Sequence, residues 1–100
     1  MSWEDIIKSR KRCCKLAKGE FVRQTIMIMK SKGMRFTQDD VDVFSKGVAN
    51  ADCDGFKLKV SRWAKGSELP KGPQGLVRQL AANATHEFWN NCLERDRDYV

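Results

Sequence analysis

The chain has 100 residues, which is enough for one domain with a single hydrophobic core and too few for two. Charged residues make up 32% of the chain and hydrophobic residues 41%, which excludes a disordered chain, and no apolar run approaches the length of a membrane span. The formal net charge is +6, and residues 1–33 carry nine basic against three acidic residues. This excess favours a polyanionic partner, although a set of solvated helix faces is the simpler explanation.

The N-terminal sequence lacks the apolar region of a signal peptide, which predicts a cytoplasmic, nucleoid-associated protein. Cysteines at positions 13, 14, 53 and 92 fit that compartment as reduced thiols. On a helix, Cys13 and Cys14 would point about 100° apart, so they suit neither a disulfide with each other nor joint metal binding.

The first predicted helix begins after Ser2, which can cap it, and ends at Gly19. An apolar stripe from Trp3 to Ala17 should dock on the rest of the domain. The other surfaces are crowded with basic residues, of which we expect three consecutive ones to neutralise the phosphates of a polyanionic partner: Arg10, Lys11 and Arg12.

A second helix is predicted over residues 20–32, with Phe21 on its inner face and Gly33 as its stop. A third begins after Thr37, where Thr37 and Asp40 form an approximate capping box, and it should bury Val41, Phe44 and Val48.

Residues 50–55 are predicted to form a polar loop. They match the first six positions of a calcium-binding loop, but the twelfth position, which should supply a bidentate carboxylate, is Ser61. A polar turn is therefore favoured over a metal site.

The next helix is indicated by Phe56, Val60 and Trp63, which recur at helical spacing before the stop at Gly66. Its remaining surface carries four bases and Ser61. The alternation of apolar and polar residues over positions 55–61 leaves a strand as the alternative.

The last helix is predicted from Gln74 to about Arg95, with Leu76 and Leu80 on its apolar face and a possible break at Thr85. It is the candidate dimer interface. Together the elements predict an all-α fold, a compact five- to six-helix bundle containing a helix-turn-helix and a basic N-terminal helix. The expected units are residues 1–19, the basic helix; 20–84, the helix-turn-helix core; and 85–100, a helix packing on the core or on a dimer partner.

The sequence offers no enzymatic constellation. His86 has no nucleophile that can be placed beside it, and neither a CxxC pair nor a Walker loop occurs. We therefore expect no enzyme, no cofactor and no metal.

The words VSRW, KG, LP and LVRQLA follow one another between positions 60 and 81, and FTQDDV occupies positions 36–41. In this order they resemble the phage Cro and lambda-repressor family of helix-turn-helix proteins. The resemblance implies a sequence-specific regulator that binds double-stranded DNA as a homodimer. Base edges would be read by Lys57, Ser61 and Arg62, with the Arg62 fork suited to guanine. Phosphates would be held by Gln38, Lys59 and Lys65.

Two other functions stay open. A longer segment between Gln38 and Val60 than in the family's compact form, and Asp42 where the family usually has alanine, favour a helix-turn-helix-like protein-binding module, such as a phage-encoded inhibitor of a host enzyme. Binding of nucleic acid through the basic N-terminal helix alone, without base reading, is the third possibility.

Overall fold

The computed structural model describes residues 2–98, and these form four helices and no strand. The helices are α1 (Trp3–Ser31), α2 (Gln38–Asn50), α3 (Cys53–Ala64) and α4 (Pro73–Asp98). The all-α prediction is confirmed, whereas the expected number of five to six helices is not. None of the described helices is both long and apolar enough to cross a bilayer.

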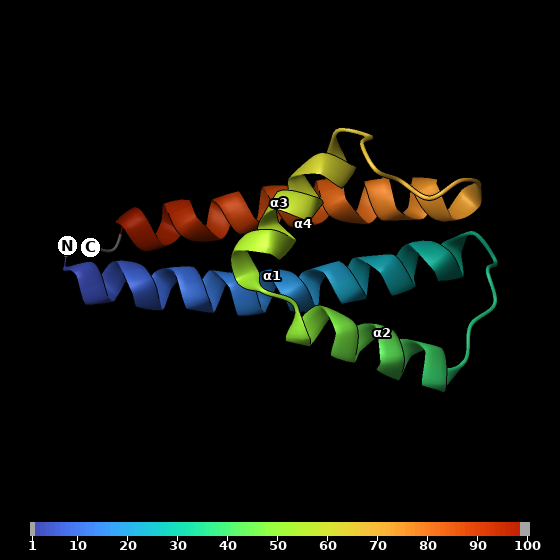
Figure 1. Ribbon diagram of the computed structural model, residues 1–100, viewed down its shortest axis with the longest axis horizontal. Coiled ribbons are helices and arrows are strands. Elements are labelled where there is room, and N and C mark those ends of the chain that lie inside the picture. Colours follow the sequence, from blue (N-terminus) through green and yellow to red (C-terminus); the bar gives the residue numbers. More distant parts are fainter. Residues whose placement is uncertain (1, 99–100) are drawn as a thin grey trace.

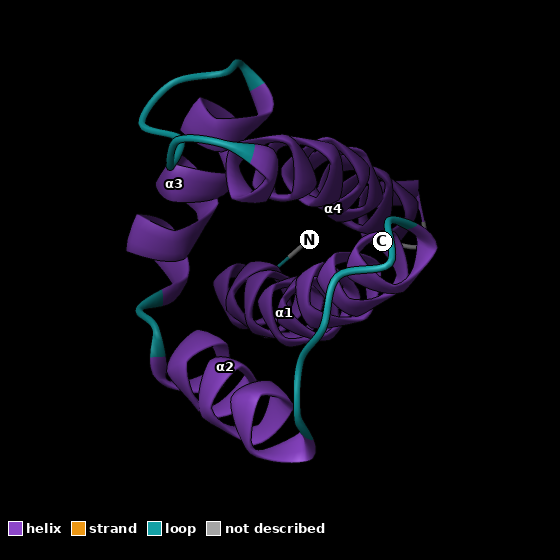
Figure 2. Ribbon diagram, turned by 90° about the vertical axis from the view of Figure 1, so that its right-hand side faces the viewer, coloured by secondary structure: helices purple, strands orange, loops and turns teal. Residues whose placement is uncertain are grey.

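Two long antiparallel helices form the frame of the molecule. α1 and α4 pack along each other, so that the start of α1 and the end of α4 lie at the same end (Figure 1). α2 packs on α1 and α3 packs mainly on α4, and together they cover one side of the pair (Figure 2). α2 and α3 barely touch each other, and the arrangement does not confirm a helix-turn-helix.

The long helices α1 and α4 extend beyond the part that α2 and α3 cover (Figure 1). The radius of gyration is 14.4 Å, compared with about 13 Å for a typical compact domain of this length. The start of α1 is therefore less covered than the rest of the helix. Trp3, which the sequence predicts on a docked stripe, is 70% exposed, and the stripe is buried only from Cys13 onward.

Gly19 does not end a helix, because α1 continues through it for twelve more residues to Ser31. Glycine inside a helix costs about 1 kcal/mol relative to alanine. Buried residues on both sides of it, from Cys13 to Phe21, compensate by packing in the core. The two predicted N-terminal helices are thus one helix, and the expected domain boundary at residue 19 lies inside it.

α4 is also continuous, and the boundary expected at residue 84 lies inside it. Thr85 is fully buried and its hydroxyl donates to the carbonyl of Ala81 at 2.8 Å, so it caps nothing. Leu76 and Leu80, expected in the core, are 47% and 41% exposed. The buried face carries small side chains instead, among them Ala81 and Ala82, which let α1 approach closely.

Two predicted helix starts, at Ser2 and Thr37, and the predicted helix end at Gly66 agree with the structure. Ser2 accepts a hydrogen bond from the Asp5 amide, and Thr37 and Asp40 form the predicted capping box. Gly66 ends the α3 region with a φ of 88°, which favours glycine. The strand alternative for residues 55–61 is wrong, because they are helical within α3.

Aromatic side chains form the centre of the core. Phe21 contacts the rings of Phe44, Phe56 and Trp63, with centroid distances of 5.4 to 5.8 Å. Phe56 reaches Trp89 on α4, 6.0 Å away. Trp63 is therefore a core contact, as its spacing from Phe56 predicts, although it stays half-buried.

The four cysteines form two disulfide bonds, so the prediction of reduced thiols is wrong. Cys13 is bonded to Cys92 of α4, and Cys14 to Cys53 at the start of α3. Because neighbouring positions of a helix point in different directions, the two cysteines reach different helices. Disulfides of this kind persist mainly in oxidising compartments and in the cytoplasm of hyperthermophiles, so the cysteines no longer support an ordinary cytoplasmic location.

Candidate nucleic-acid interface

The exposed face of α3 holds some of the residues predicted to read bases. Arg62 and Lys59 are exposed, and Ser61 is half-buried beside them. Lys57 is turned elsewhere: its Nζ lies 5.8 Å from the centroid of the Trp89 ring, a cation–π distance. The outer face therefore presents Arg62 and Ser61, without Lys57.

Arg62 makes only a weak ion pair within the chain. Its Nη1 lies 3.4 Å from a carboxylate oxygen of Glu68, and both side chains are about half exposed, at 49% and 58%. Exposed pairs of this kind are worth at most about 1 kcal/mol. The guanidinium can exchange this partner for another acceptor at little cost.

The residues predicted to hold phosphates have diverse surroundings. Lys59 is exposed on α3 and Lys65 directly after its end, and Arg10 and Lys11 are exposed on α1. Gln38, the first residue of α2, donates to Asp42 at 3.0 Å and lies on a different helix from all of them.

Arg12 is a structural residue in this fold. Its guanidinium pairs with the Asp96 carboxylate on α4, which also accepts a hydrogen bond from the Ser9 hydroxyl at 2.7 Å. The Ser9 hydrogen bond, aided by the Arg12 charge and opposed by burial, lowers the pKa of the Asp96 carboxyl. This group, the Asp96 clasp, joins the start of α1 to the end of α4 beside the Cys13–Cys92 bond.

The structure brings three of the nine predicted DNA contacts around one hollow. Arg10 and Lys11 of α1 and Lys57 of α3 line a space of about 770 Å³, but three acids line it as well: Asp5, Asp54 and Asp96. Its charge is balanced, so it does not by itself favour an anion.

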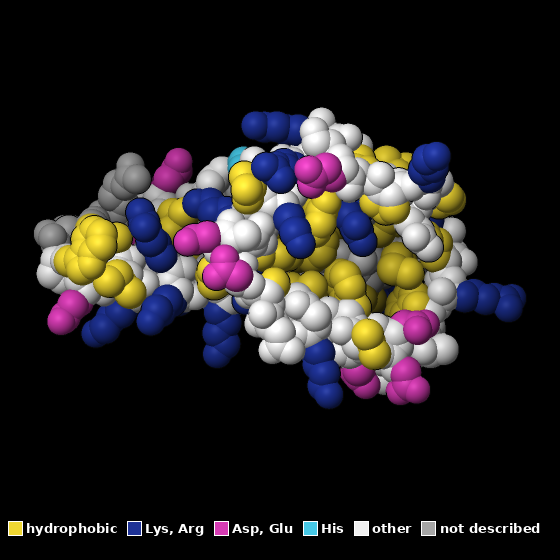
Figure 3. All heavy atoms as spheres, in the orientation of Figure 1, with side chains coloured by type: hydrophobic (Ala, Val, Ile, Leu, Met, Phe, Trp, Pro, Cys, Tyr) yellow, Lys and Arg dark blue, Asp and Glu magenta, His cyan; other side chains and the backbone are white. Residues whose placement is uncertain are grey.

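A more strongly basic surface lies on the neighbouring side of α1. Lys8, Lys11, Lys15 and Lys18 follow a spacing of three and four residues, which places them in one row along the helix, with Glu4 at its tip. Three of them line the groove between α1 and the end of α2, and no acidic residue is among the described residues that line this groove. Figure 3 shows basic side chains along the lower edge of the molecule here, while acidic ones gather farther right, over the start of α2.

The same face of α1 changes character after Lys18. Val22, Thr25 and Met29 continue the same spacing of three and four residues, and here α2 covers the helix. Lys18 lies at the boundary between the exposed lysines and the covered part of α1. Its Nζ donates to the carbonyls of Ala49 and Ala51 at 3.0 and 2.6 Å and so caps the end of α2. Sequence reasoning missed this role, although the regular spacing from position 8 to 29 could have revealed the shared face.

No protein-family model, no curated protein and no solved structure matches this chain. The likeness to the Cro and lambda-repressor family therefore rests on the sequence words alone, and the function has to be argued from the surface just described.

Proposed function

We propose that the protein binds double-stranded DNA as a sequence-specific transcriptional regulator of the small repressor kind. The observation that carries the proposal is the lysine row of α1, defined as Lys8, Lys11 and Lys15, all exposed and without an ion-pair partner among the described residues. From Lys8 to Lys15 the helix rises by about 10.5 Å. A DNA strand presents one phosphate per about 3.4 Å of axis, so the row spans about three phosphate steps.

Sequence reading is assigned to the exposed face of α3. Arg62 is half exposed, and its loose contact with Glu68 leaves the guanidinium fork able to bind the two acceptors of a guanine. Lys59 and Lys65 flank it and are suited to phosphates. Lys57 would first have to leave the Trp89 ring, so it is the weakest of the three predicted base contacts.

A homodimer associated with the nucleoid belongs to the same proposal, and the two disulfides restrict it to a cell whose cytoplasm lets disulfides persist, as in hyperthermophiles. Leu76 and Leu80 lie one turn apart on α4 and remain exposed, which supports this helix as the dimer interface. A two-fold dimer predicts a palindromic site with two half-sites.

The test is selection of bound sequences from random duplex DNA, followed by binding isotherms at several salt concentrations. Replacing Lys8, Lys11 and Lys15 with glutamine should weaken binding to all duplexes alike. The slope of log affinity against log salt should become shallower by about 0.9 for each phosphate that the protein no longer neutralises. The control replaces Lys30, Lys32 and Arg35, which have the same charge but lie in the last turn of α1 and just beyond it, and should change the slope far less.

A second variant separates sequence reading from backbone binding. Arg62→Ala should cost about 1–3 kcal/mol on the selected sequence and leave binding to random DNA nearly unchanged. Equal losses of affinity on both would assign Arg62 to the phosphates. Strong binding without an enriched sequence would reduce the function to nucleic-acid binding by the lysine row.

One observation favours the protein-binding alternative. Leu58 is 52% exposed one turn before Arg62 on α3. An apolar side chain among the proposed base-reading residues donates no hydrogen bond to DNA but gains from burial against a protein. Absence of DNA binding at low salt would favour this alternative, with Leu58→Asp as the variant that should abolish capture of the partner.

A further inference from the structure

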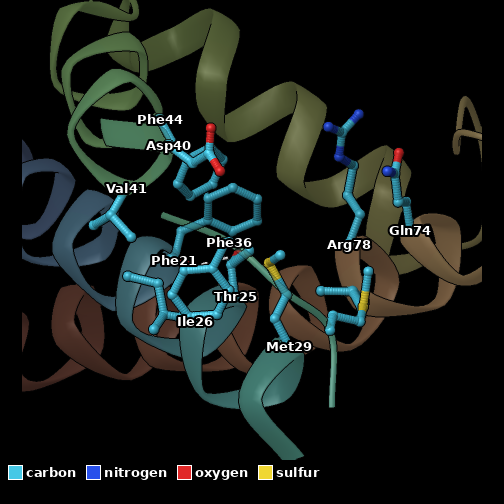
Figure 4. A pocket seen from close by; sticks show the side chains of 12 residues that line it. Phe21, Thr25, Ile26, Met29, Phe36, Asp40, Val41, Phe44, Gln74 and Arg78 are labelled. Carbon is cyan, nitrogen blue, oxygen red and sulfur yellow. Dashed lines mark hydrogen bonds between the residues drawn. The ribbon is translucent and has the colours of Figure 1, made fainter. Parts of the chain in front are cut away.

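The end of the molecule away from the disulfides contains an apolar pocket. It has a volume of about 230 Å³ and lies between the second half of α1, α2 and the start of α4. Figure 4 shows aromatic, aliphatic and thioether side chains around it, from Phe21 and Met29 of α1 to Val41 and Phe44 of α2. These groups can solvate an apolar molecule but offer it no directional contact.

Arg78 supplies the directional group. It lies at one edge of the pocket next to Gln74, one turn earlier on α4 (Figure 4). Its guanidinium carbon is 4.9 Å from the centroid of the Trp63 ring, which in turn stacks on Phe21. The side chain is thus held in place by a cation–π contact to the aromatic core.

Arg78 uses none of its hydrogen-bonding capacity within the described part of the chain. Among residues 2–96, no carboxylate pairs with it and no side chain or backbone carbonyl accepts a hydrogen bond from it. The acid on the pocket lining, Asp40, accepts a hydrogen bond from the Thr37 amide at the start of α2. A half-buried arginine that is fixed but unpaired, next to an apolar cavity, is suited to a carboxylate, which its planar fork binds through two parallel hydrogen bonds.

We propose that this pocket binds a small organic monocarboxylate with an apolar body, its carboxylate on Arg78 and its body among the side chains of α1 and α2. A cavity of about 150 Å³ accommodates benzene, and pockets for drug-sized ligands start at about 300 Å³. The volume of about 230 Å³ therefore fits one aromatic ring with a short chain, or a medium-length aliphatic chain. The proposal does not depend on DNA binding.

The experiment uses the full chain with both disulfides intact and 3-phenylpropanoate as the probe, titrated by calorimetry and by tryptophan fluorescence. Binding should change the emission, because Trp63 contacts both Arg78 and Phe21, which line the pocket. The alcohol and the amine with the same body should bind at least about tenfold more weakly, since they cannot form the charge-assisted pair. Equal affinity of the acid and the alcohol, or no binding of the acid, would overturn the proposal.

Two matched variants test the assignment of the carboxylate. Arg78→Gln should weaken binding of the acid by about 10- to 100-fold and leave the alcohol unchanged. Arg95→Gln makes the same change in charge on the same helix, about 25 Å farther along it, and should leave both unchanged. Equal effects of the two variants would mean that only net charge matters and would contradict the Arg78 site.

A third variant tests the pocket itself and guards against misfolding. Val41→Trp should fill the cavity and abolish binding of both the acid and the alcohol, while circular dichroism and the melting curve show a folded helical chain. NMR shift changes on adding the acid should centre on the methyl groups of Met29 and Val41. Changes centred on the lysine row instead would place the acid on that surface and refute the pocket.

Discussion

The two ends of the molecule are held together by different forces. One, the braced end, comprises residues 3–18, 53–54 and 90–96, and contains both disulfides and the Asp96 clasp. The other, the aromatic end, comprises residues 19–50 and 55–89, and is held by rings packed around Phe21 and by apolar side chains. The braced end carries the lysine row, and the aromatic end carries the pocket.

The contrast follows from how much surface each end can bury. At the aromatic end, α2 and α3 cover the long pair of helices and allow a core with aromatic contacts. At the braced end, α1 and α4 run on as a pair, and apolar side chains there, such as Trp3 and Ile7, stay exposed. Apart from Ala17 and three of the cysteines, none of the described residues of the braced end is buried. Covalent bonds therefore replace most of the apolar burial there, as in many small domains.

Reduction of the disulfides should have the largest effect. Cys13–Cys92 and Cys14–Cys53 close segments with sequence separations of 79 and 39. By loop-closure entropy each bond contributes about 4 kcal/mol to the free energy of unfolding. A reducing agent should therefore lower the melting temperature by more than about 15 °C, measured by circular dichroism against the oxidised protein.

Reduction also tests the division into two ends. In reduced protein, amide hydrogen exchange should accelerate first in residues 3–18 and 90–96, while residues around Phe21 stay protected longer. Peptide mapping should show the two pairings in the oxidised form. Free thiols at all four cysteines of the oxidised protein would contradict this division into two ends. A uniform loss of hydrogen-exchange protection on reduction would contradict it as well.

Loss of the central ring should be the next largest effect. Phe21→Ala removes a buried side chain that contacts three other rings, at a cost of about 3–5 kcal/mol. Chemical denaturation should show this destabilisation whether or not the disulfides are intact. The control is Met27→Ala on the same helix, 51% exposed, which should cost less than about 1 kcal/mol. Equal costs for the two would show that the aromatic end is not organised around Phe21.

Local signals in the sequence predict the all-α class, three helix starts and the helical state of residues 55–61, because caps and periodicity act within a few residues. Local signals fail where packing between distant segments determines where a helix ends and which of its faces is buried. Gly19 is a stop by propensity but is overruled by packing along α1 and α4. Leu76 and Leu80 suit the core by size, whereas the close approach of α1 selects the face with Ala81 and Ala82.

The candidate interface is predictable in part for the same reason. The sequence alone predicts exposed basic residues on α1 and α3, such as Lys11 and Arg62. The internal partners of Lys57 and Arg12, which are Trp89 and Asp96, lie 32 and 84 residues away, and no local pattern indicates them. The disulfide partners are equally hidden, because four cysteines allow three pairings.

A smaller effect is expected where the two ends meet. Lys18→Met removes the ammonium that binds the last carbonyls of α2 and should cost about 1 kcal/mol. The measurement is the free energy of unfolding in urea, with Lys15→Met, an exposed lysine one turn earlier on α1, as the control. A cost for Lys18→Met no larger than that of the control would show that Lys18 does not stabilise the end of α2.

The Asp96 clasp gives the smallest effect and the one that depends on pH. The hydrogen bond from Ser9 is the largest influence on this carboxyl, and with the Arg12 charge it lowers the pKa below the ordinary value of 3.8. A carboxyl whose pKa is lower in the folded than in the unfolded state stabilises the fold above the ordinary value, and this contribution is lost as the pH falls through the lowered pKa. The difference in unfolding free energy between the natural protein and Asp96→Asn should therefore be constant at neutral pH and shrink below about pH 4. Ser9→Ala should weaken this pH dependence without abolishing it, because Arg12 remains. A difference that stays constant down to pH 2 would show that Asp96 acts by shape alone, and the braced end would then depend on its disulfides without an ionic contribution.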